Sequence, residues 1–300
     1  DGMLARYFPA GVSTLNKLYD KQMEERKAAG VTDEVLERSK AYGEELADVI
    51  LEWSEADKYV ETRYMQYKSP TREGHPSNWE PTDFNQTPLE PFWGTHRTFF
   101  VKDGTQCDID KAPAYGGKGD TTGGLYKQAK KVWTVDKTLT EEQRTIAQYW
   151  ADDPSETSTP AGHWMEIMGN FVKSENMKLD RACELYALVT TSMNDACITV
   201  WHTKYRVNLV RPKTVIQETL DSKWEPYVET PPFAGYTSGH SGFSGAAATI
   251  LTSRIGDNLA FIDSSHVDIG LLPRNFKSFN DAAQEAAYSR MYGGIHFDCD

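Results

Sequence analysis

Apolar side chains recur every three or four residues through most of the chain, which is the period of a helix with one buried face. Residues typical of helix ends bound these segments. Thr32 and Thr140 stand at expected helix starts, and Gly30 and Gly293 stand at expected helix ends. Strand-like alternation is scarce. The sequence therefore predicts helices over residues 13–29, 32–53, 140–150, 162–174, 179–210, 238–251 and 279–291.

Between residues 67 and 124 the chain changes character and becomes rich in Pro, Gly, Asn, Thr and Trp, without a regular period. A segment this long without regular structure is usually functional or packed over a core, and its aromatic residues favour packing. We therefore expect an all-α fold built around a helical bundle. It should be a single domain spanning 1–300, in which the N-terminal helices and the aromatic, Pro-rich segment, together 1–135, pack on a bundle formed by 136–300.

The composition excludes several classes of protein. The 300 residues include 44 acidic and 32 basic side chains, and the net charge of -12 disfavours nucleic acid, anionic lipid and small anions alike. Aromatic residues make up 12% of the chain, which favours a folded protein, and no run approaches the ~20 apolar residues of a membrane span. The four cysteines form no CxxC pair, so we expect isolated buried thiols.

Candidate chemistry begins with Lys204 and Arg211, which are separated by six residues and followed by Pro212. A step of seven residues is nearly two helical turns, so both cations are expected on one face of the predicted helix 179–210. Trp201 lies one turn earlier on this face. Taken alone, the pair indicates no more than a solvated basic helix end.

A second group is Ser238-Gly239-His240, at the junction between a Pro-rich linker and a predicted helix. Helix N-termini present unpaired amides, so an oxyanion there could accept hydrogen bonds from the Ser238 hydroxyl and the Gly239 amide, with His240 above it. The alternative is that Ser238 only caps the helix and His240 lies on the surface.

A third group is Arg290, His296 and Asp300 near the end of the chain. On an unbroken helix Arg290 and His296 would point to different faces, but Gly293-Gly294 can end the helix and fold His296 back. Asp300 could then orient the imidazole and fix its tautomer. The alternative is a helix C-terminus with a core histidine.

Together the three groups match the needs of a tetrahedral oxyanion of high charge. They supply three positive charges, neutral hydrogen-bond donors, a nitrogen nucleophile or ligand in His296, and a general acid in His240. The cations are Lys204, Arg211 and Arg290, and the neutral donors are Ser238 and Gly239.

The motifs KxxxxxxRP from Lys204, SGH from Ser238 and SRxxxxxHxxxD from Ser289 resemble, in this order, the signature of the superfamily of vanadium-dependent haloperoxidases and type 2 phosphatidic acid phosphatases. Thr237 stands where this family usually has Pro. Trp201 and Phe233 resemble residues on the halide side of haloperoxidase pockets, and the spacing most resembles the bacterial vanadium-dependent iodoperoxidases of marine flavobacteria. The motifs cover the last third of the chain.

This resemblance implies that the protein binds vanadate, vanadium(V), tethered through His296 as the metal ligand. Halide, with iodide the easiest to oxidise, would attack peroxovanadate formed from hydrogen peroxide and give a hypohalous acid equivalent, while His240 helps deprotonate the peroxide. The resemblance also implies a bacterial protein, secreted or periplasmic. The vanadate oxygens would be held by Lys204, Arg211, Ser238, Gly239 and Arg290, with Asp300 behind His296 and with Trp201 and Phe233 toward the halide.

The same residues suit a second reaction. In an acid phosphatase of this superfamily, His296 would attack phosphorus to form a phosphohistidine and His240 would protonate the leaving alcohol. Trp201, Phe233 and the aromatic N-terminal region favour the haloperoxidase. A non-catalytic oxyanion-binding domain is less favoured, because both histidines are present. The oligomeric state cannot be deduced, and we expect the native chain to continue past Asp300.

Overall fold

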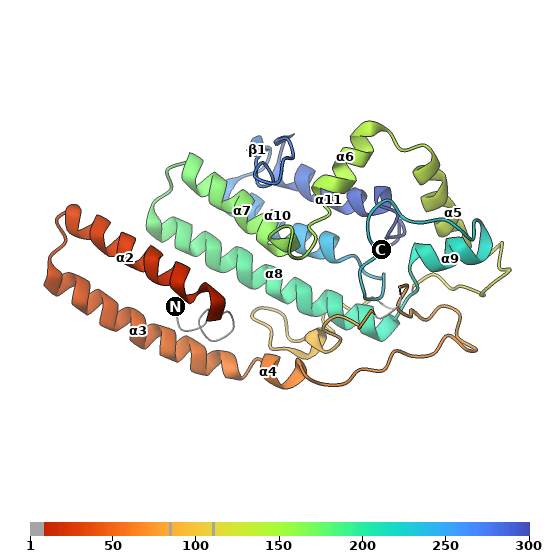
Figure 1. Cartoon of the computed structure of the whole chain (residues 1–300), viewed down its shortest axis with the longest axis horizontal. Helices are drawn as coiled ribbons and strands as arrows, with labels where there is room; N and C mark the ends of the chain where they lie inside the picture. The colour runs from red at the N-terminus through yellow and green to blue at the C-terminus, as the bar shows by residue number, and fades with distance from the viewer. Residues whose placement is uncertain (1–8, 84–85, 110–111) are drawn as a thin grey trace. The chain divides into compact units, whose positions relative to one another are not determined.

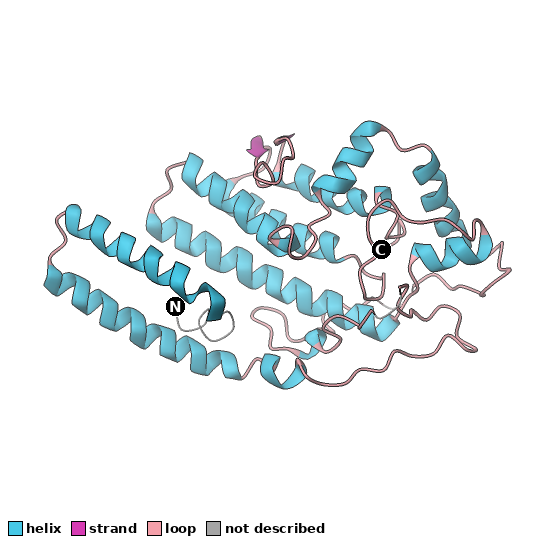
Figure 2. Ribbon diagram, in the orientation of Figure 1, coloured by secondary structure: helices cyan, strands magenta, loops and turns pink. Residues whose placement is uncertain are grey.

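The computed structural model describes residues 9–83, 86–109 and 112–300, and the chain divides into two compact units, Asp1–Glu61 and Thr62–Asp300. Helices dominate both units, which confirms the predicted all-α fold (Figures 1 and 2). The arrangement of 1–135 and 136–300 as a single domain stays a prediction. None of the described helices is long and apolar enough to cross a membrane.

The first unit is a helical hairpin. Helices α2 and α3 fall where the sequence predicts them, joined by a turn in which Gly30 has a left-handed φ of +89°. The Thr32 hydroxyl accepts a hydrogen bond of 3.4 Å from the backbone of Val35, as expected of an N-cap. The elements are η1 Pro9–Gly11, α2 Val12–Ala28, α3 Asp33–Glu55 and α4 Tyr59–Thr62, the last ending at the junction of the units.

The second unit is a helical bundle in which α8 contacts α7 and α10, α10 contacts α11, and α11 contacts α6. Figure 1 shows α8 as its longest helix, running alongside α7 and α10. Strands β1 and β2 form a small antiparallel hairpin that pairs Phe261 with Phe276. The elements are η2 Trp93–Thr95, α5 Gly124–Lys137, α6 Glu141–Tyr149, α7 Thr159–Ser174, α8 Leu179–Val207, α9 Pro212–Thr219, α10 Gly239–Ile255, β1 Phe261–Asp263, β2 Arg274–Phe276 and α11 Phe279–Tyr292.

Parts of the irregular segment that precedes α5 are anchored on α8. The backbone amide of the fully buried Trp79 donates to the carbonyl of Asn208 at 2.7 Å. Asp195, on α8, accepts hydrogen bonds of 2.6 to 3.1 Å from three successive backbone amides, those of residues 99–101. Buried backbone amides need hydrogen-bond partners, and the Asp195 carboxylate supplies them in place of water. These bonds hold the irregular segment in one conformation.

Three sequence expectations are corrected here. The helix predicted over 179–210 ends at Val207, because Asn208 takes a left-handed φ of 50° as the C-cap. Pro212 then begins a further helix, α9, which the sequence analysis missed together with α5. All four cysteines are free thiols, but Cys107 and Cys183 are exposed, so the expectation of buried thiols is wrong for these two.

Candidate active site

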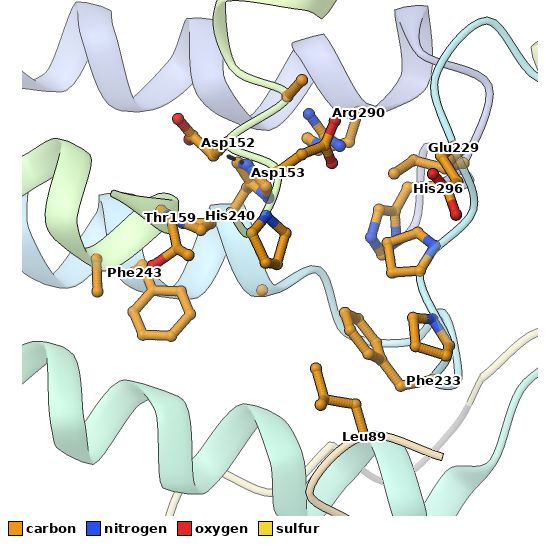
Figure 3. Close-up of a pocket in the computed structure, with 18 of the residues that line it drawn as sticks. Leu89, Asp152, Asp153, Thr159, Glu229, Phe233, His240, Phe243, Arg290 and His296 are labelled. Atoms are coloured by element: carbon orange, nitrogen blue, oxygen red, sulfur yellow. Dashed lines mark ion pairs between the residues drawn. The ribbon is translucent and has the colours of Figure 1, made fainter. Parts of the chain in front are cut away.

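A pocket of about 560 Å³ opens between the start of α10, the end of α11 and the linker that precedes α10. Figure 3 shows His240, Arg290 and His296 at one end of this pocket and Phe233 and Leu89 at the other. The volume lies within the range of small-molecule sites, which combine apolar walls with a few polar groups. The apolar side chains of the wall include Leu89, Trp201, Pro231, Pro232, Phe233, Phe243 and Ile295.

The three predicted cations come from three different helices. Lys204 lies in the last turn of α8, Arg211 is the N-cap of α9, and Arg290 lies in the last turn of α11. The expectation that Lys204 and Arg211 share a face of one helix is wrong, since α8 ends between them. They come together because the turn at Asn208 folds the chain back toward the linker before α10, whose carbonyls both side chains contact.

All three cations are buried, with exposed fractions of 0% for Lys204, 0% for Arg211 and 2% for Arg290. Their partners are mainly backbone carbonyls: Lys204 Nζ donates to the carbonyls of residues 234 and 235 at 3.0 and 2.8 Å, and Arg290 donates to that of residue 150. Within the described part of the chain, none of the three forms an ion pair with a carboxylate. Burial lowers the pKa of Lys204 well below its usual range, that of Arg211 to about 9 and that of Arg290 to about 10, so the protein does not fully compensate a positive charge at any of the three.

His296 is held in one tautomer. Its Nδ1 lies 2.7 Å from Asp300 Oδ2, and its Nε2 lies 3.1 Å from the Nη1 of Arg211. A guanidinium can only donate, so Nε2 is the acceptor and the ring proton resides on Nδ1, facing Asp300. Burial, and then the positive charges of Arg211, Lys204 and Arg290, hold the pKa of His296 well below its usual range. Nε2 therefore keeps an unprotonated lone pair.

The side chain of Asp300, which contacts His296, is itself fully buried. Burial raises its pKa to about 6, although Lys204 and Arg211 act to lower it. The fold-back of His296 follows the predicted mechanism, because α11 ends at Tyr292 and Gly294 takes a left-handed φ of +79°.

The second motif forms the start of α10. Ser238 is the N-cap and its hydroxyl accepts a bond of 3.3 Å from the amide of Ser241. Its role toward an oxyanion stays a prediction. Gly239 lies against Trp201, since a β-carbon added to it would stand 3.6 Å from the indole. His240 is not a surface residue: it lines the pocket, and burial together with Arg290 lowers its pKa to about 4.

Trp201 and Phe233 lie where the sequence analysis expected, on the wall of the pocket. Their ring centroids are 5.3 Å apart. The Phe233 ring also lies 5.0 Å from Lys204 Nζ and 5.0 Å from Arg211 Cζ. This contact places an aromatic face over two buried cations and shields them from water on the pocket side.

The sequence analysis missed a cluster next to His240. His240 Nε2 lies 3.3 Å from Asp152 Oδ2, a close charge contact without the geometry of a hydrogen bond (Figure 3). Asp152 in turn contacts His163 and His266. An Asp-Asp-Pro sequence directly after a predicted helix was the only local signal for this cluster.

The donor set fits an oxyanion. Within the described residues, the buried atoms Arg211 Nη2, Arg290 Nε and His240 Nε2 make no hydrogen bond. Leaving a buried donor unsatisfied costs ~1–3 kcal/mol, and more when it is charged. A multiply charged oxyanion in front of His296 would supply acceptors to both guanidinium groups and a counter-charge to the three cations.

The chain is similar to proteins of known family and structure. A family model described as "VCPO second helical-bundle domain" matches residues 184–223 and 217–300. The structure resembles a solved structure titled "Crystal structure of the first bacterial vanadium dependant iodoperoxidase", with a TM-score of 0.81 and 41% sequence identity over 86% of this chain and 64% of that chain. Among curated proteins, no sequence matches.

The chain belongs to the vanadium-dependent haloperoxidase family. Two structures of a bacterial vanadium-dependent chloroperoxidase, holo and apo, share its fold at TM-scores of 0.60 and 0.61, with 18% and 17% identity. Each alignment covers 78% of this haloperoxidase-family chain, and 60% and 61% of the holo and apo chloroperoxidase chains, respectively. The chain thus spans less than two thirds of the length of each of these relatives.

Proposed function

We propose that this protein is a vanadium-dependent haloperoxidase that oxidises halide, foremost iodide, with hydrogen peroxide to a hypohalous acid equivalent. The observation that carries this proposal is the convergence of three buried cations, held mainly by neutral carbonyls, around the unprotonated Nε2 of His296. The similarity to a structure titled as a bacterial iodoperoxidase supports it, at 41% identity.

Vanadate fits the donor set described above, and His296 Nε2 would be its ligand. When bound, vanadium(V) would act as a Lewis acid toward peroxide without changing its oxidation state. The buried cations would neutralise the charge of the oxygens and withdraw electron density from the bound oxidant. The remaining oxygen contacts would come from Lys204, Arg211, Ser238, Gly239 and Arg290.

His240 is suited to act as a base. With a pKa of about 4, it is unprotonated at neutral pH and can accept a proton from incoming hydrogen peroxide. The nearby Asp152 carboxylate stabilises the imidazolium that results. His240 could then return this proton to a hydroxyl group of the bound anion, which would leave as water as the peroxide replaces it, so one residue would serve as base and acid in turn.

Trp201 and Phe233 form the apolar side of the pocket beside the cations. We propose that they position the halide and exclude water from it. Iodide is the largest and least hydrated of the common halides. It therefore loses the least hydration free energy when it enters an aromatic pocket. This supports iodide as the preferred substrate.

The proposal is tested by following peroxide-dependent oxidation of iodide and bromide with and without added vanadate. Hydrolysis of p-nitrophenyl phosphate is measured beside it, since the same residues could serve a phosphatase with His296 as the nucleophile. Vanadate-dependent iodide oxidation is expected. Phosphate ester hydrolysis without such oxidation would replace the proposal with the phosphatase, and equal kcat/KM values for bromide and iodide would contradict the iodide preference.

A further inference from the structure

His163 lies between two carboxylates in the interior of the bundle. Its Nδ1 is 2.9 Å from Asp152 Oδ1 and its Nε2 is 2.9 Å from Asp263 Oδ2, and its side chain is fully buried. A neutral imidazole can donate from only one nitrogen, whereas an imidazolium donates from both. With an ionised carboxylate at each nitrogen, the geometry requires the imidazolium.

Both carboxylates are fixed by further contacts. Asp263 Oδ1 accepts from the amide and the hydroxyl of Ser265 at 3.0 and 2.7 Å. Asp152 takes a left-handed φ of 53°, a conformation that Asp tolerates better than most residues, and its Oδ1 also contacts His266 Nε2 at 3.2 Å. Its second oxygen, Oδ2, is left facing His240. Asp263, His163, Asp152 and His240 thus form a continuous chain of contacts.

The aromatic environment favours a positive charge on His163. The Trp150 ring stacks on the imidazole with centroids 4.5 Å apart and an interplanar angle of 29°. An indole face attracts a cation more strongly than it attracts a neutral ring. The contacts also raise the pKa of His163 to about 9, because its bonds with Asp152 and Asp263 outweigh the effect of burial.

Asp152, His163 and His266 could instead be considered as metal ligands, because one atom from each lies within 4.8 Å of the others. The rings of the two histidines are too close for this interpretation, with centroids 4.2 Å apart. Two imidazoles bound tetrahedrally to zinc at ~2.0 Å would have centroids about 5 Å apart. The cluster is therefore better described as hydrogen-bonded.

We propose that His163, held as an imidazolium between Asp152 and Asp263, is a positioning residue that keeps the Asp152 carboxylate ionised and turned toward His240. The role assigned to His240 rests on the proposed function, whereas the charge state of His163 does not. Burial alone would favour a protonated Asp152, which could not stabilise the imidazolium of His240. His163 acts on the reaction only through Asp152.

The first test measures the charge of His163 directly. In the protein labelled with ¹⁵N-histidine, His163 is assigned by its absence from the spectrum of His163→Gln, and both of its nitrogens are expected to be protonated at pH 7.5. A single protonated nitrogen, or a stoichiometric metal found by elemental analysis that His163→Gln removes, would overturn the proposal. This result is independent of turnover, so failure of the wild type to oxidise iodide contradicts the proposed function alone.

The second test separates positioning from a general structural role. In His163→Gln, kcat for iodide oxidation should fall by ~10-fold or more, as is usual for outer-shell partners of active-site groups. The acidic limb of the pH profile of kcat should shift to higher pH, because Asp152 then becomes protonated at a higher pH than in the wild type. Vanadate affinity, measured by ⁵¹V NMR, should change little. His75→Gln makes the same substitution at an exposed histidine and should leave all three quantities unchanged.

Asp263→Asn supplies an independent variant that leaves His163 in place. It removes one of the two carboxylates, so the pKa of His163 falls and activity should decline at a lower alkaline pH than in the wild type. Among the described residues, the other titratable or charged groups near His163 and Asp152 include His266, His240, Tyr149, Arg274 and Arg290, and this substitution changes none of them. Equal loss of kcat at every pH in both variants would mean a structural role and would refute the proposal.

Discussion

The ion pairs of His163 should make the stability of the protein depend on alkaline pH. The pKa of His163 is raised from 6.5 to about 9 in the folded protein. This difference of 2.5 corresponds to about 3 kcal/mol of stability at ~1.4 kcal/mol for each pKa unit. The side chain is fully buried, so no reduction for solvent screening applies. The contribution is complete below pH 6.5 and is lost as the pH rises through about 9.

This loss can be isolated by comparing Tm for the wild type and His163→Gln from pH 6 to pH 10. Each kcal/mol shifts Tm by roughly 2–4 °C in a chain of this size, so the difference in Tm should shrink by about 6–12 °C over this range. Gln does not titrate, and other groups contribute equally to both proteins. His75→Gln should show a flat difference near zero. A difference for His163→Gln that does not vary with pH would refute the assignment of His163 as an imidazolium.

Three further predictions concern the oxyanion site. His296→Ala should abolish vanadate binding, followed by ⁵¹V NMR, as well as turnover; retained activity would remove His296 as the ligand. His240→Ala should still bind vanadate but lose ~10²–10⁴-fold in kcat, since it removes the proton acceptor. Lys204→Met should fold with Tm unchanged or raised, because it removes a buried charge. Vanadate at ~100 times the wild-type Kd should stabilise the wild type by ~2.7 kcal/mol, and at the same concentration it should raise the Tm of Lys204→Met much less; an equal rise in Tm would show that Lys204 does not contact the anion.

The sequence predicts those parts of the site that depend on local signals. Ser238 precedes a helix of small residues and caps it, and Gly293-Gly294 end α11 so that His296 turns back. Such signals extend over a few residues and depend little on the rest of the fold. The motif order then identified the family, although it carried no information about the walls of the pocket.

Arg211 shows where periodicity fails. A helix that continued to residue 210 would have placed it on the same face as Lys204, but Asn208 ends α8 early. The left-handed φ of Asn208 is fixed by a tertiary contact. Its carbonyl accepts a hydrogen bond from the backbone amide of Trp79, which is remote in sequence. Helix propensity and residue spacing cannot predict such a contact, because they depend only on neighbouring residues, whereas the contact that stabilises this conformation comes from a distant part of the chain.

The cluster around His163 was beyond sequence reasoning for the same reason. Its partners Asp152 and Asp263 lie 11 and 100 residues away along the chain. A histidine beside Trp164 on an apolar helix face looks like a packing residue, and the structure confirms that it is buried. What the pattern could not show is that both of its nitrogens face carboxylates supplied by a loop after α6 and by β1.

The neutral partners of the cations explain how a chain of net charge -12 can hold an anion. Had Lys204 and Arg211 been paired with carboxylates, their charges would have been cancelled within the protein. They are instead held largely by carbonyls of the linker before α10 and of the loop after α11, which satisfy hydrogen bonds without adding negative charge. The bound oxyanion can then interact with charges that are already desolvated and oriented, so the acidic surface has little bearing on what the site binds.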